Sequence, residues 1–143
     1  MEKKEIVLAA LATADGEIHT PVQVQKLLFL IDKKIPHLVG GPYFNFVPYA
    51  YGPFDIGIYR LLEELEEKEE VEIIRYPTSR WSKYRLTIKG QEKGVGVLKE
   101  MGQKAADYIK ELSLFVRKLS FAELISAIYK EYPEMKENSV FAG

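Results

Sequence analysis

The fold is decided by residues 51–90, YGPFDIGIYRLLEELEEKEEVEIIRYPTSRWSKYRLTIKG. In this stretch Gly52-Pro53 predicts the start of a helix, because proline is favoured at the first helical position. Apolar residues then recur at helical spacing and predict a buried stripe of Phe54, Ile58, Leu61, Leu62 and Leu65. Residues 71–76 and 83–88 alternate with the period of two that is typical of a hairpin with one covered face. We therefore expect a third helix followed by a β-hairpin with Trp81 at its tip.

Two helices are expected before this stretch. Apolar residues at helical spacing predict the first over about residues 3–14, ended by Asp15-Gly16, with residues 17–19 extended. Thr20-Pro21-Val22-Gln23 predicts the start of the second helix, with Thr20 as its N-cap, and Ile35-Pro36 predicts its end. Residues 36–51 are expected to form an aromatic-rich loop with one short strand.

The order helix, short strand, helix, helix, hairpin is that of a winged helix-turn-helix domain. The run YRLTIKG, residues 84–90, also resembles the end of the wing in many transcription regulators, where it leads into another helix. The predicted fold class is mainly α within α+β. We expect a winged helix-turn-helix with a β-hairpin wing and additional C-terminal helices.

A long helix is predicted after the hairpin, from residue 92 or 96 to Lys118. Its apolar residues alternate in spacing between three and four, as in a heptad seam, and these residues are Leu98, Met101, Ala105, Tyr108, Leu112 and Phe115. Such a seam packs either on the chain's own body or against a second copy in a homodimer. Ser120-Phe121-Ala122-Glu123 is a capping box that predicts a last helix up to Tyr132, before a loose tail over residues 138–143. We expect one winged-helix domain over residues 1–143, with residues 92–132 as a C-terminal helical extension and candidate dimerisation element.

The composition is that of an ordinary globular protein. The chain has 143 residues, of which 47% are hydrophobic and 29% charged. No apolar run approaches the roughly 20 residues that a membrane span needs, and no apolar segment typical of a signal peptide follows Met1. We therefore expect a cytoplasmic protein that does not enter membranes. Cysteine is absent, which excludes disulfides, thiolate metal sites and a thiol nucleophile.

Residues that could carry catalysis are sparse. The sequence has no Gly-x-Ser-x-Gly motif, and His19 and His37 have no partner at helical or hairpin spacing. The glutamates of residues 63–70 lie on a solvated helix face, where their pKa values have little reason to shift. The glycines of residues 90–96 match neither the dinucleotide fingerprint nor the P-loop and are expected in a linker and a frayed helix start. We expect no enzyme activity, metal, cofactor or small-molecule substrate.

Charge is distributed unevenly, although the net charge is only −1. Acidic residues dominate residues 54–70 and basic residues dominate residues 71–93, so the third helix and the hairpin carry opposite charge. Basic side chains can neutralise phosphates, and the candidate nucleic-acid-binding residues are Arg60, Arg75, Arg80, Trp81, Lys83, Arg85 and Lys89. The alternative is that these bases pair with the neighbouring glutamates while Trp81 folds back on the body.

The third helix is poorly suited to the major groove, because phosphates would repel the glutamates on its exposed face. The same face suits a basic protein partner. The aromatic residues between Tyr43 and Tyr51 either pack in the core or anchor a protein interface. The candidate protein-binding residues are Tyr49, Tyr51, Phe54, Glu63 and Glu67.

Three motifs resemble the Panacea antitoxin family, also described as a phage-associated domain. They are QKLLF at residues 25–29, YGPF at residues 51–54, and YPEM at residues 132–135 with Asn138-Ser139. The resemblance covers about residues 21–139. It implies an antitoxin or adaptor that acts through protein contacts, in some members beside DNA binding, and it carries no catalytic residue.

Two functions are therefore expected from the sequence. The leading one is a winged-helix regulatory protein that contacts DNA through the hairpin and the start of the third helix. The alternative is a protein-binding antitoxin or adaptor module of the Panacea type, which uses the acidic third helix and the aromatic loop to bind a toxin-like partner.

Overall fold

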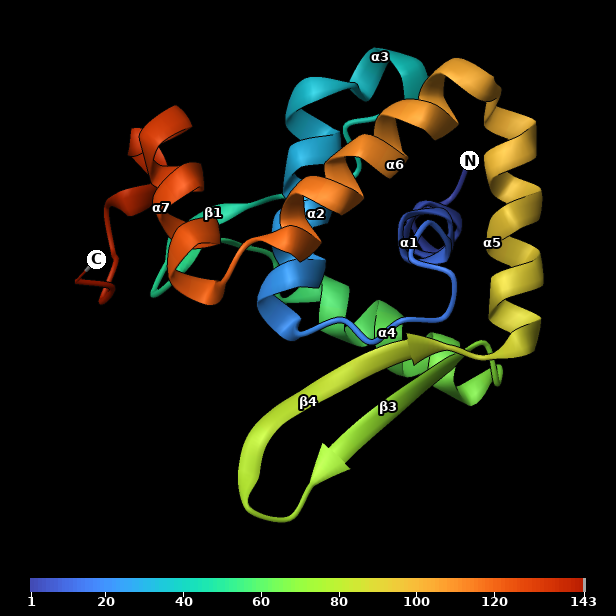
Figure 1. Ribbon diagram of the computed structural model, residues 1–143, viewed down its shortest axis with the longest axis horizontal. Coiled ribbons are helices and arrows are strands. Elements are labelled where there is room, and N and C mark those ends of the chain that lie inside the picture. The colour runs from blue at the N-terminus through green and yellow to red at the C-terminus, as the bar shows by residue number, and fades with distance from the viewer. Residues whose placement is uncertain (143) are drawn as a thin grey trace.

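The computed structural model describes residues 1–142 and shows a mainly helical α+β protein with two antiparallel hairpins (Figure 1). The helices are α1 (Lys3–Ala12), α2 (Pro21–Lys34), α3 (Pro36–Val39), α4 (Gly57–Glu67), α5 (Ile88–Met101), α6 (Gln103–Lys118) and α7 (Phe121–Glu131). The strands are β1 (Val47–Tyr49), β2 (Gly52–Phe54), β3 (Val71–Tyr76) and β4 (Ser79–Leu86), and a 3₁₀ helix, η1, spans Pro133–Lys136. Among residues 1–142, no helix combines the length and the apolar character needed to cross a bilayer.

The core is built around α1, which lies among α4, α5 and α6 and is seen end-on in Figure 1. Every residue from Ile6 to Ala12 is buried. A helix that is apolar on all sides is stable only when neighbours cover all its faces. The predicted helix is confirmed, but α1 ends two residues earlier than expected, and Asp15 and Gly16 turn the chain with positive φ angles of 50° and 87°.

The start of α2 is as predicted. The Thr20 hydroxyl accepts a hydrogen bond from the Gln23 amide at 3.2 Å, and the Gln23 side chain accepts one from the Thr20 amide at 2.9 Å. This reciprocal box satisfies backbone donors that a helix start leaves free. The helix then ends before Ile35-Pro36, also as expected.

The prediction for residues 36–56 is wrong in two respects. These residues form α3 and the β1–β2 hairpin instead of a loop with one strand, and the third helix, α4, begins at Gly57 instead of Gly52-Pro53. Pro53 lies in β2, directly opposite Pro48 of β1. Proline is tolerated in such a two-stranded ribbon because it can sit where no ladder donor is needed. Asp55, expected inside the helix, precedes it and accepts the Gly57 amide proton at 2.8 Å.

The β3–β4 hairpin is confirmed, but β4 starts and ends earlier than the predicted residues 83–88, and Ile88 is the exposed first residue of α5. Val71 pairs with Leu86 and Ile73 with Tyr84, and the turn is only Pro77-Thr78. Trp81 therefore lies within β4, near the turn rather than at it. His19, in the segment expected to be extended, forms an isolated antiparallel bridge with Tyr84 through two backbone hydrogen bonds of 2.8 and 2.9 Å.

The single long helix predicted after the hairpin is two helices. Gly102, with φ of +95°, separates α5 from α6, which cross at a steep angle in Figure 1. The heptad seam is not continuous as predicted, because the helix breaks at Gly102, between Met101 and Ala105; Tyr108 and Phe115 are exposed. The buried residues of α6 are Ala105, Ile109, Leu112, Ser113 and Val116, which pack toward the chain's own core.

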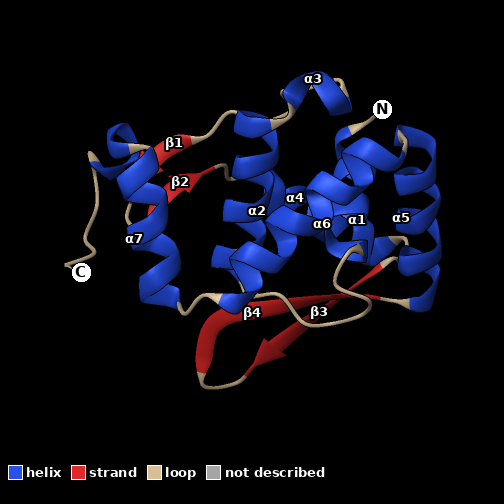
Figure 2. Cartoon of the chain, turned by 45° about the horizontal axis from the view of Figure 1, so that its top comes forward, coloured by secondary structure: helices blue, strands red, loops and turns tan. Residues whose placement is uncertain are grey.

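The C-terminal part lies at the end of the molecule opposite α5, where α7 sits beside β1 and β2 (Figure 2). The capping box that starts α7 is confirmed, since Ser120 and Glu123 bond to each other's backbone amides. Helix α2 contacts both α6 and β2 and thus joins the two ends of the molecule. Residues 138–142 form no helix or strand, but Val140 donates to the Ala50 carbonyl at 2.9 Å, so this part of the tail is anchored; Gly143 lies outside the described residues.

Candidate functional site

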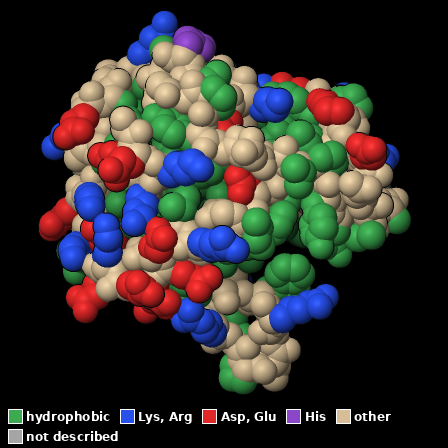
Figure 3. Space-filling view, turned by 180° about the vertical axis from the view of Figure 1, so that it is seen from behind, with side chains coloured by type: hydrophobic (Ala, Val, Ile, Leu, Met, Phe, Trp, Pro, Cys, Tyr) green, Lys and Arg blue, Asp and Glu red, His purple; other side chains and the backbone are tan. Residues whose placement is uncertain are grey.

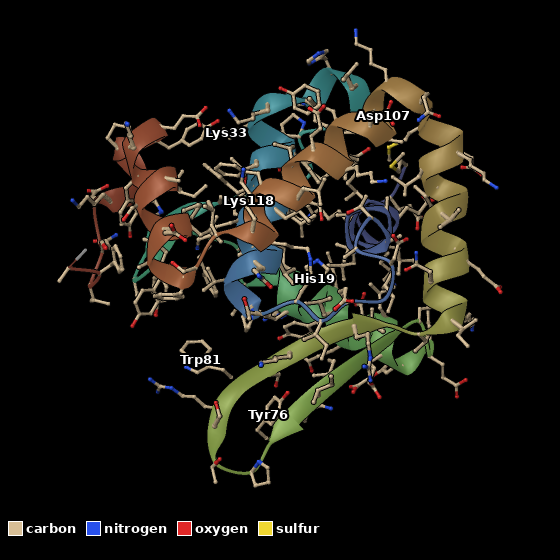
Figure 4. All side chains as sticks on the ribbon, viewed as in Figure 1. His19, Lys33, Tyr76, Trp81, Asp107 and Lys118 are labelled. Atoms are coloured by element: carbon tan, nitrogen blue, oxygen red, sulfur yellow. The ribbon has the colours of Figure 1, made fainter. Side chains whose placement is uncertain are left out.

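A groove opens between the β3–β4 hairpin and the C-terminal end of the molecule. It consists of two adjoining cavities of about 400 and 440 Å³, which share Pro21, Val22, Tyr51 and Trp81 in their linings. Trp81 projects from the curved part of β4 toward α7 (Figure 4). We call these two cavities the aromatic groove. In Figure 3 hydrophobic side chains gather at this hollow beside the hairpin.

Six aromatic side chains belong to the described lining of the groove: Tyr49, Tyr51, Phe54, Tyr59, Trp81 and Phe121. Tyr49, Trp81 and Phe121 remain 56%, 53% and 49% exposed. Tyr49 stacks on Phe54 with ring centroids 5.1 Å apart, and Tyr51 meets Phe121 edge-on at 5.3 Å. A cluster of large, half-exposed aromatic residues is typical of surfaces that bind a partner.

Local structure explains why Tyr49 and Tyr51 reach the groove. The β1–β2 turn places Tyr49 opposite Gly52, whose φ of +99° is a conformation that glycine adopts without strain. The C-terminal segment then holds this turn, because Val140 bonds to the Ala50 carbonyl. Tyr49 at the end of β1 and Tyr51 in the turn are thus held in place by the C-terminal segment.

Lys26 of α2 lines the inner part of the groove and is only 3% exposed. Its ammonium group donates to the Pro53 carbonyl at 3.1 Å, and no carboxylate of residues 1–142 pairs with it. Burial without an ionic partner lowers the pKa of Lys26 to about 7. A Cβ on Gly52 would lie 3.5 and 3.6 Å from its Cε and Nζ atoms, which is ordinary van der Waals distance, so Gly52 lies directly beside the amine. The amine is therefore poised between its charged and neutral forms near neutral pH.

Sequence reasoning missed Lys26, although a signal was present. The residue interrupts the apolar run of α2, whose residues from Val24 to Asp32 are all buried. A lysine on a helix that is covered on every side has to be buried as well. The sequence analysis also missed Pro21, Tyr59 and Phe121, for a different reason. Each of them fits a helix start or a buried helix position, so none stood out as a candidate for binding.

The candidate nucleic-acid-binding residues are divided among different environments. Arg75 forms two hydrogen bonds to Glu66, of 2.7 and 3.0 Å, and Arg85 pairs with Glu72. Lys89 donates to the Lys68 carbonyl at 2.9 Å. Much of the opposite charge on α4 and the hairpin is thus paired internally, and Figure 3 shows acidic and basic side chains interspersed on that face.

The remaining candidate nucleic-acid-binding residues lie in other surroundings. Arg60 is exposed on α4, while Arg80, Trp81 and Lys83 line the aromatic groove. The Arg80 guanidinium lies 5.5 Å from the Trp81 ring, and the Lys83 ammonium lies 5.6 Å from the ring of Tyr76. The hairpin therefore contributes its unpaired bases to the groove rather than to a continuous basic face.

The candidate protein-binding residues also separate into two groups. Tyr49, Tyr51 and Phe54 line the groove, whereas Glu63 and Glu67 are exposed on α4. The structure thus brings together members of the two sets that the sequence had assigned to different partners. The aromatic groove joins three aromatic residues of the protein-binding set to Arg80, Trp81 and Lys83 of the nucleic-acid-binding set.

Neither histidine lies in a metal or catalytic cluster. His19 is 1% exposed, and both of its ring nitrogens lack a hydrogen-bond partner. Burial, followed by the charge of Arg117, lowers the pKa of His19 to about 4. Residues 1–142 contain no group of three or more histidine, aspartate and glutamate side chains arranged to hold a metal ion.

No family model matches the chain, and no curated protein matches it either.

Proposed function

We propose that this chain is a protein-interaction domain that holds an apolar segment of a partner protein in the aromatic groove. The observation that carries the proposal is the arrangement of Tyr49, Trp81 and Phe121, each about half exposed, around one hollow. The Panacea resemblance supports the same class of function, an antitoxin or adaptor that acts through protein contacts.

The charges that line the groove indicate which kind of partner segment it binds. The charged residues that line the two cavities are Lys26, Arg80 and Lys83, and the described lining includes no carboxylate. Complementary charge steers association and sets specificity. The partner segment is therefore apolar with acidic residues in or beside it, instead of the basic partner that the glutamates of α4 had suggested.

The test uses a matched pair of aromatic truncations. Large aromatic residues at an interface centre commonly contribute more than about 2 kcal/mol each, so Trp81→Ala is expected to weaken partner binding by at least about 30-fold. Tyr108→Ala removes an aromatic side chain of α6 that is 38% exposed and lies outside the groove, and it is expected to leave affinity within about twofold.

The partner is sought first in the product of the neighbouring gene, purified and titrated against each variant by calorimetry. The fluorescence of Trp81, the chain's single tryptophan, provides a second readout at the groove itself. Equal affinity of the wild type and Trp81→Ala would overturn the proposal.

DNA binding is the second candidate, because the element order favours a winged-helix core. Helices α1, α2 and α4, the His19–Tyr84 bridge and the β3–β4 hairpin follow one another as in that fold. Three features weigh against a conventional mode of binding. Residues 35–56 separate α2 from α4 where a helix-turn-helix has a short turn, Arg75 and Arg85 are paired with glutamates, and the exposed face of α4 is acidic.

A salt titration of duplex binding tests this second function. If Arg80 and Lys83 are the phosphate contacts, the logarithm of the affinity falls against the logarithm of salt with a slope of about −2. The double variant Arg80→Gln/Lys83→Gln then loses that slope. Absence of duplex binding at low salt would remove DNA as a partner.

A further inference from the structure

Lys26, at the inner end of the aromatic groove, has no carboxylate to pair with among the described lining residues. Lys26 has three N–H donors when protonated, of which the Pro53 carbonyl accepts one. The remaining described lining of that cavity includes five aromatic residues and the exposed Arg80, but no carboxylate. An ammonium group in such surroundings lacks the counter-ion that normally accompanies a buried charge.

We propose that Lys26 binds the carboxylate of an aspartate or glutamate side chain in the partner segment, so that the groove recognises an acidic residue flanked by apolar ones. This assignment rests on the proposed function, because it concerns the chemistry of the same groove. The incoming carboxylate supplies the missing counter-ion, while the neighbouring apolar side chains cover Tyr49, Trp81 and Phe121.

The number and position of the cations favour a carboxylate over a phosphate. Lys26 is the one deeply buried cation of the described lining, whereas Arg80 and Lys83 lie on the exposed hairpin. A phosphate is usually held by several donors, commonly a bidentate arginine or a cluster of backbone amides. Arg80 lines the same cavity, but it lies on the exposed strand with its guanidinium beside the Trp81 ring. Lys26 is therefore the one buried charge there, and one buried charge matches a monoanion.

A protonation change follows from this pairing. A carboxylate favours the charged form of the lysine, so binding raises the pKa of Lys26 above its free value of about 7. Above pH 7 the free protein has to take up a proton in order to bind. The affinity for an acidic segment is therefore expected to fall as the pH rises, by up to about tenfold per unit.

Other titratable groups near Lys26 are few. They are the phenols of Tyr49, Tyr51 and Tyr59 and the guanidinium of Arg80 in the same cavity, and the phenol of Tyr129, whose ring also lies beside Gly52. Phenols and guanidinium groups ordinarily titrate at about pH 10 and above. The lysine is thus the group whose charge changes between pH 6.5 and pH 9 at this site.

The test uses two peptide libraries as probes, both N-acetylated and C-amidated. Each hexapeptide has leucine, isoleucine, methionine or phenylalanine at the varied positions, with glutamate fixed in one library and glutamine in the other. Binding is followed by the fluorescence of Trp81 and by calorimetry. Wild-type protein at about pH 6.5 is expected to bind the glutamate library at least about tenfold more tightly, and this preference disappears by about pH 9.

Lys26→Met is the matched variant, because methionine keeps an unbranched apolar stem and fits a buried site. It is expected to bind both libraries alike at every pH. Equal binding of the two libraries by the wild type, a glutamate preference that persists in Lys26→Met, or no binding of the glutamate library at millimolar concentration would overturn the assignment.

Trp81→Ala separates this inference from the proposed function. If Trp81→Ala loses the natural partner while Lys26→Met retains full, pH-independent affinity for it, the groove binds protein but the carboxylate assignment is wrong. If Trp81→Ala retains the partner, the proposed function itself fails.

Discussion

Lys26 and His19 are both bases whose pKa is lowered by burial. Lys26 lies under the aromatic groove with one backbone acceptor, and the His19 ring lies in the interior with no partner for either nitrogen. Charging either group inside the protein requires loss of its hydration without an ion pair in return. Each therefore links the free energy of unfolding to pH, in a window that its lowered pKa sets.

His19 is expected to make the protein sensitive to acid. Its pKa is about 4 in the folded chain and 6.5 when unfolded, so between these values the unfolded state binds more protons. The stability that depends on neutral His19 is complete above pH 6.5 and is lost as the pH falls toward 4, by about 3 kcal/mol in total. Urea unfolding at pH 7 and pH 4 measures this loss. His19→Phe is expected to lose correspondingly less over the same interval, and an equal loss in both proteins would contradict the assignment.

Lys26→Met is expected to stabilise the fold. Methionine removes the cost of burying an amine, which outweighs the lost hydrogen bond to Pro53, and the gain is on the order of 2 kcal/mol at neutral pH. The unfolded lysine binds a proton up to about pH 10.5 but the folded one only up to about 7, so wild-type stability rises across this window. Chemical denaturation at pH 7 and pH 10 should show the advantage of the variant shrinking with pH. A variant less stable than the wild type at pH 7 would refute this account.

Among the helices, α5 depends on two glycines, Gly90 and Gly94. The sequence had suggested that they lie in a linker and a frayed helix start, but both lie within the helix. The helix begins at Ile88, where Thr87 accepts the Gly90 amide proton at 3.0 Å, and it packs closely along α1. A Cβ on Gly90 would lie 1.9 Å from the Glu70 carbonyl oxygen, and one on Gly94 would lie 2.5 Å from that of Leu8. Because both positions are glycine, the backbone of α5 lies closer to Glu70 and to α1 than any larger residue would allow.

Gly94→Ala is expected to destabilise the protein by about 2 kcal/mol or more, because the added methyl group overlaps the backbone of α1. Gly96→Ala is the control in the same helix. A Cβ there meets nothing within 4 Å, so alanine should stabilise α5 by up to about 1 kcal/mol through its helix propensity. Thermal or urea unfolding of the two variants gives effects of opposite sign; a shared sign would contradict the packing of α5 on α1.

At the scale of the whole molecule, the C-terminal segment supports one wall of the groove. Val140 bonds to the Ala50 carbonyl, Ser139 accepts the Tyr129 hydroxyl proton at 2.7 Å, and the Phe141 ring lies 6.2 Å from that of Phe121. Residues near the end of the chain thus hold a turn in its middle. The shape of the groove thus depends on contacts between segments 90 residues apart in the sequence, such as Pro48 and Asn138.

Removal of residues 137–143 is expected to loosen the groove without unfolding the core. Loss of these contacts should speed amide hydrogen exchange over residues 47–54 by about tenfold, because each lost hydrogen bond contributes about 1 kcal/mol. Amides of α1 should exchange as slowly as in the full chain. Unchanged exchange over residues 47–54 would show that the segment does not support the turn.

Local signals predicted a good part of the fold. Thr20 and Ser120 start helices with capping boxes, and the alternation in residues 71–76 and 83–88 marks the hairpin, although Ile88 begins α5, because these features depend on neighbours in the chain. The start of α4 and the break at Gly102 were mispredicted. Gly-Pro is compatible with both a helix start and a strand after a turn, and a glycine at residue 102 was compatible with a continuous helix.

The candidate site was predicted in fragments. The residues Tyr49, Tyr51, Phe54, Arg80, Trp81 and Lys83 were all singled out, but as parts of two surfaces with different partners. Their grouping could not be predicted, because the cavity linings come from segments near Pro21, Tyr51, Trp81 and Phe121. Proximity across such separations depends on how α2, the two hairpins and α7 pack.

The amino-acid sequence alone locates the capped helices and the long hairpin, because capping, turn formation and alternation act over a few residues. It also supplies the side chains that are available for binding. Packing in three dimensions is what pairs Arg75 and Arg85 with glutamates, brings aromatic residues from distant segments into one groove, and leaves Lys26 without a counter-ion or its hydration. Those outcomes depend on distances through space and on exclusion of water, which packing alone establishes.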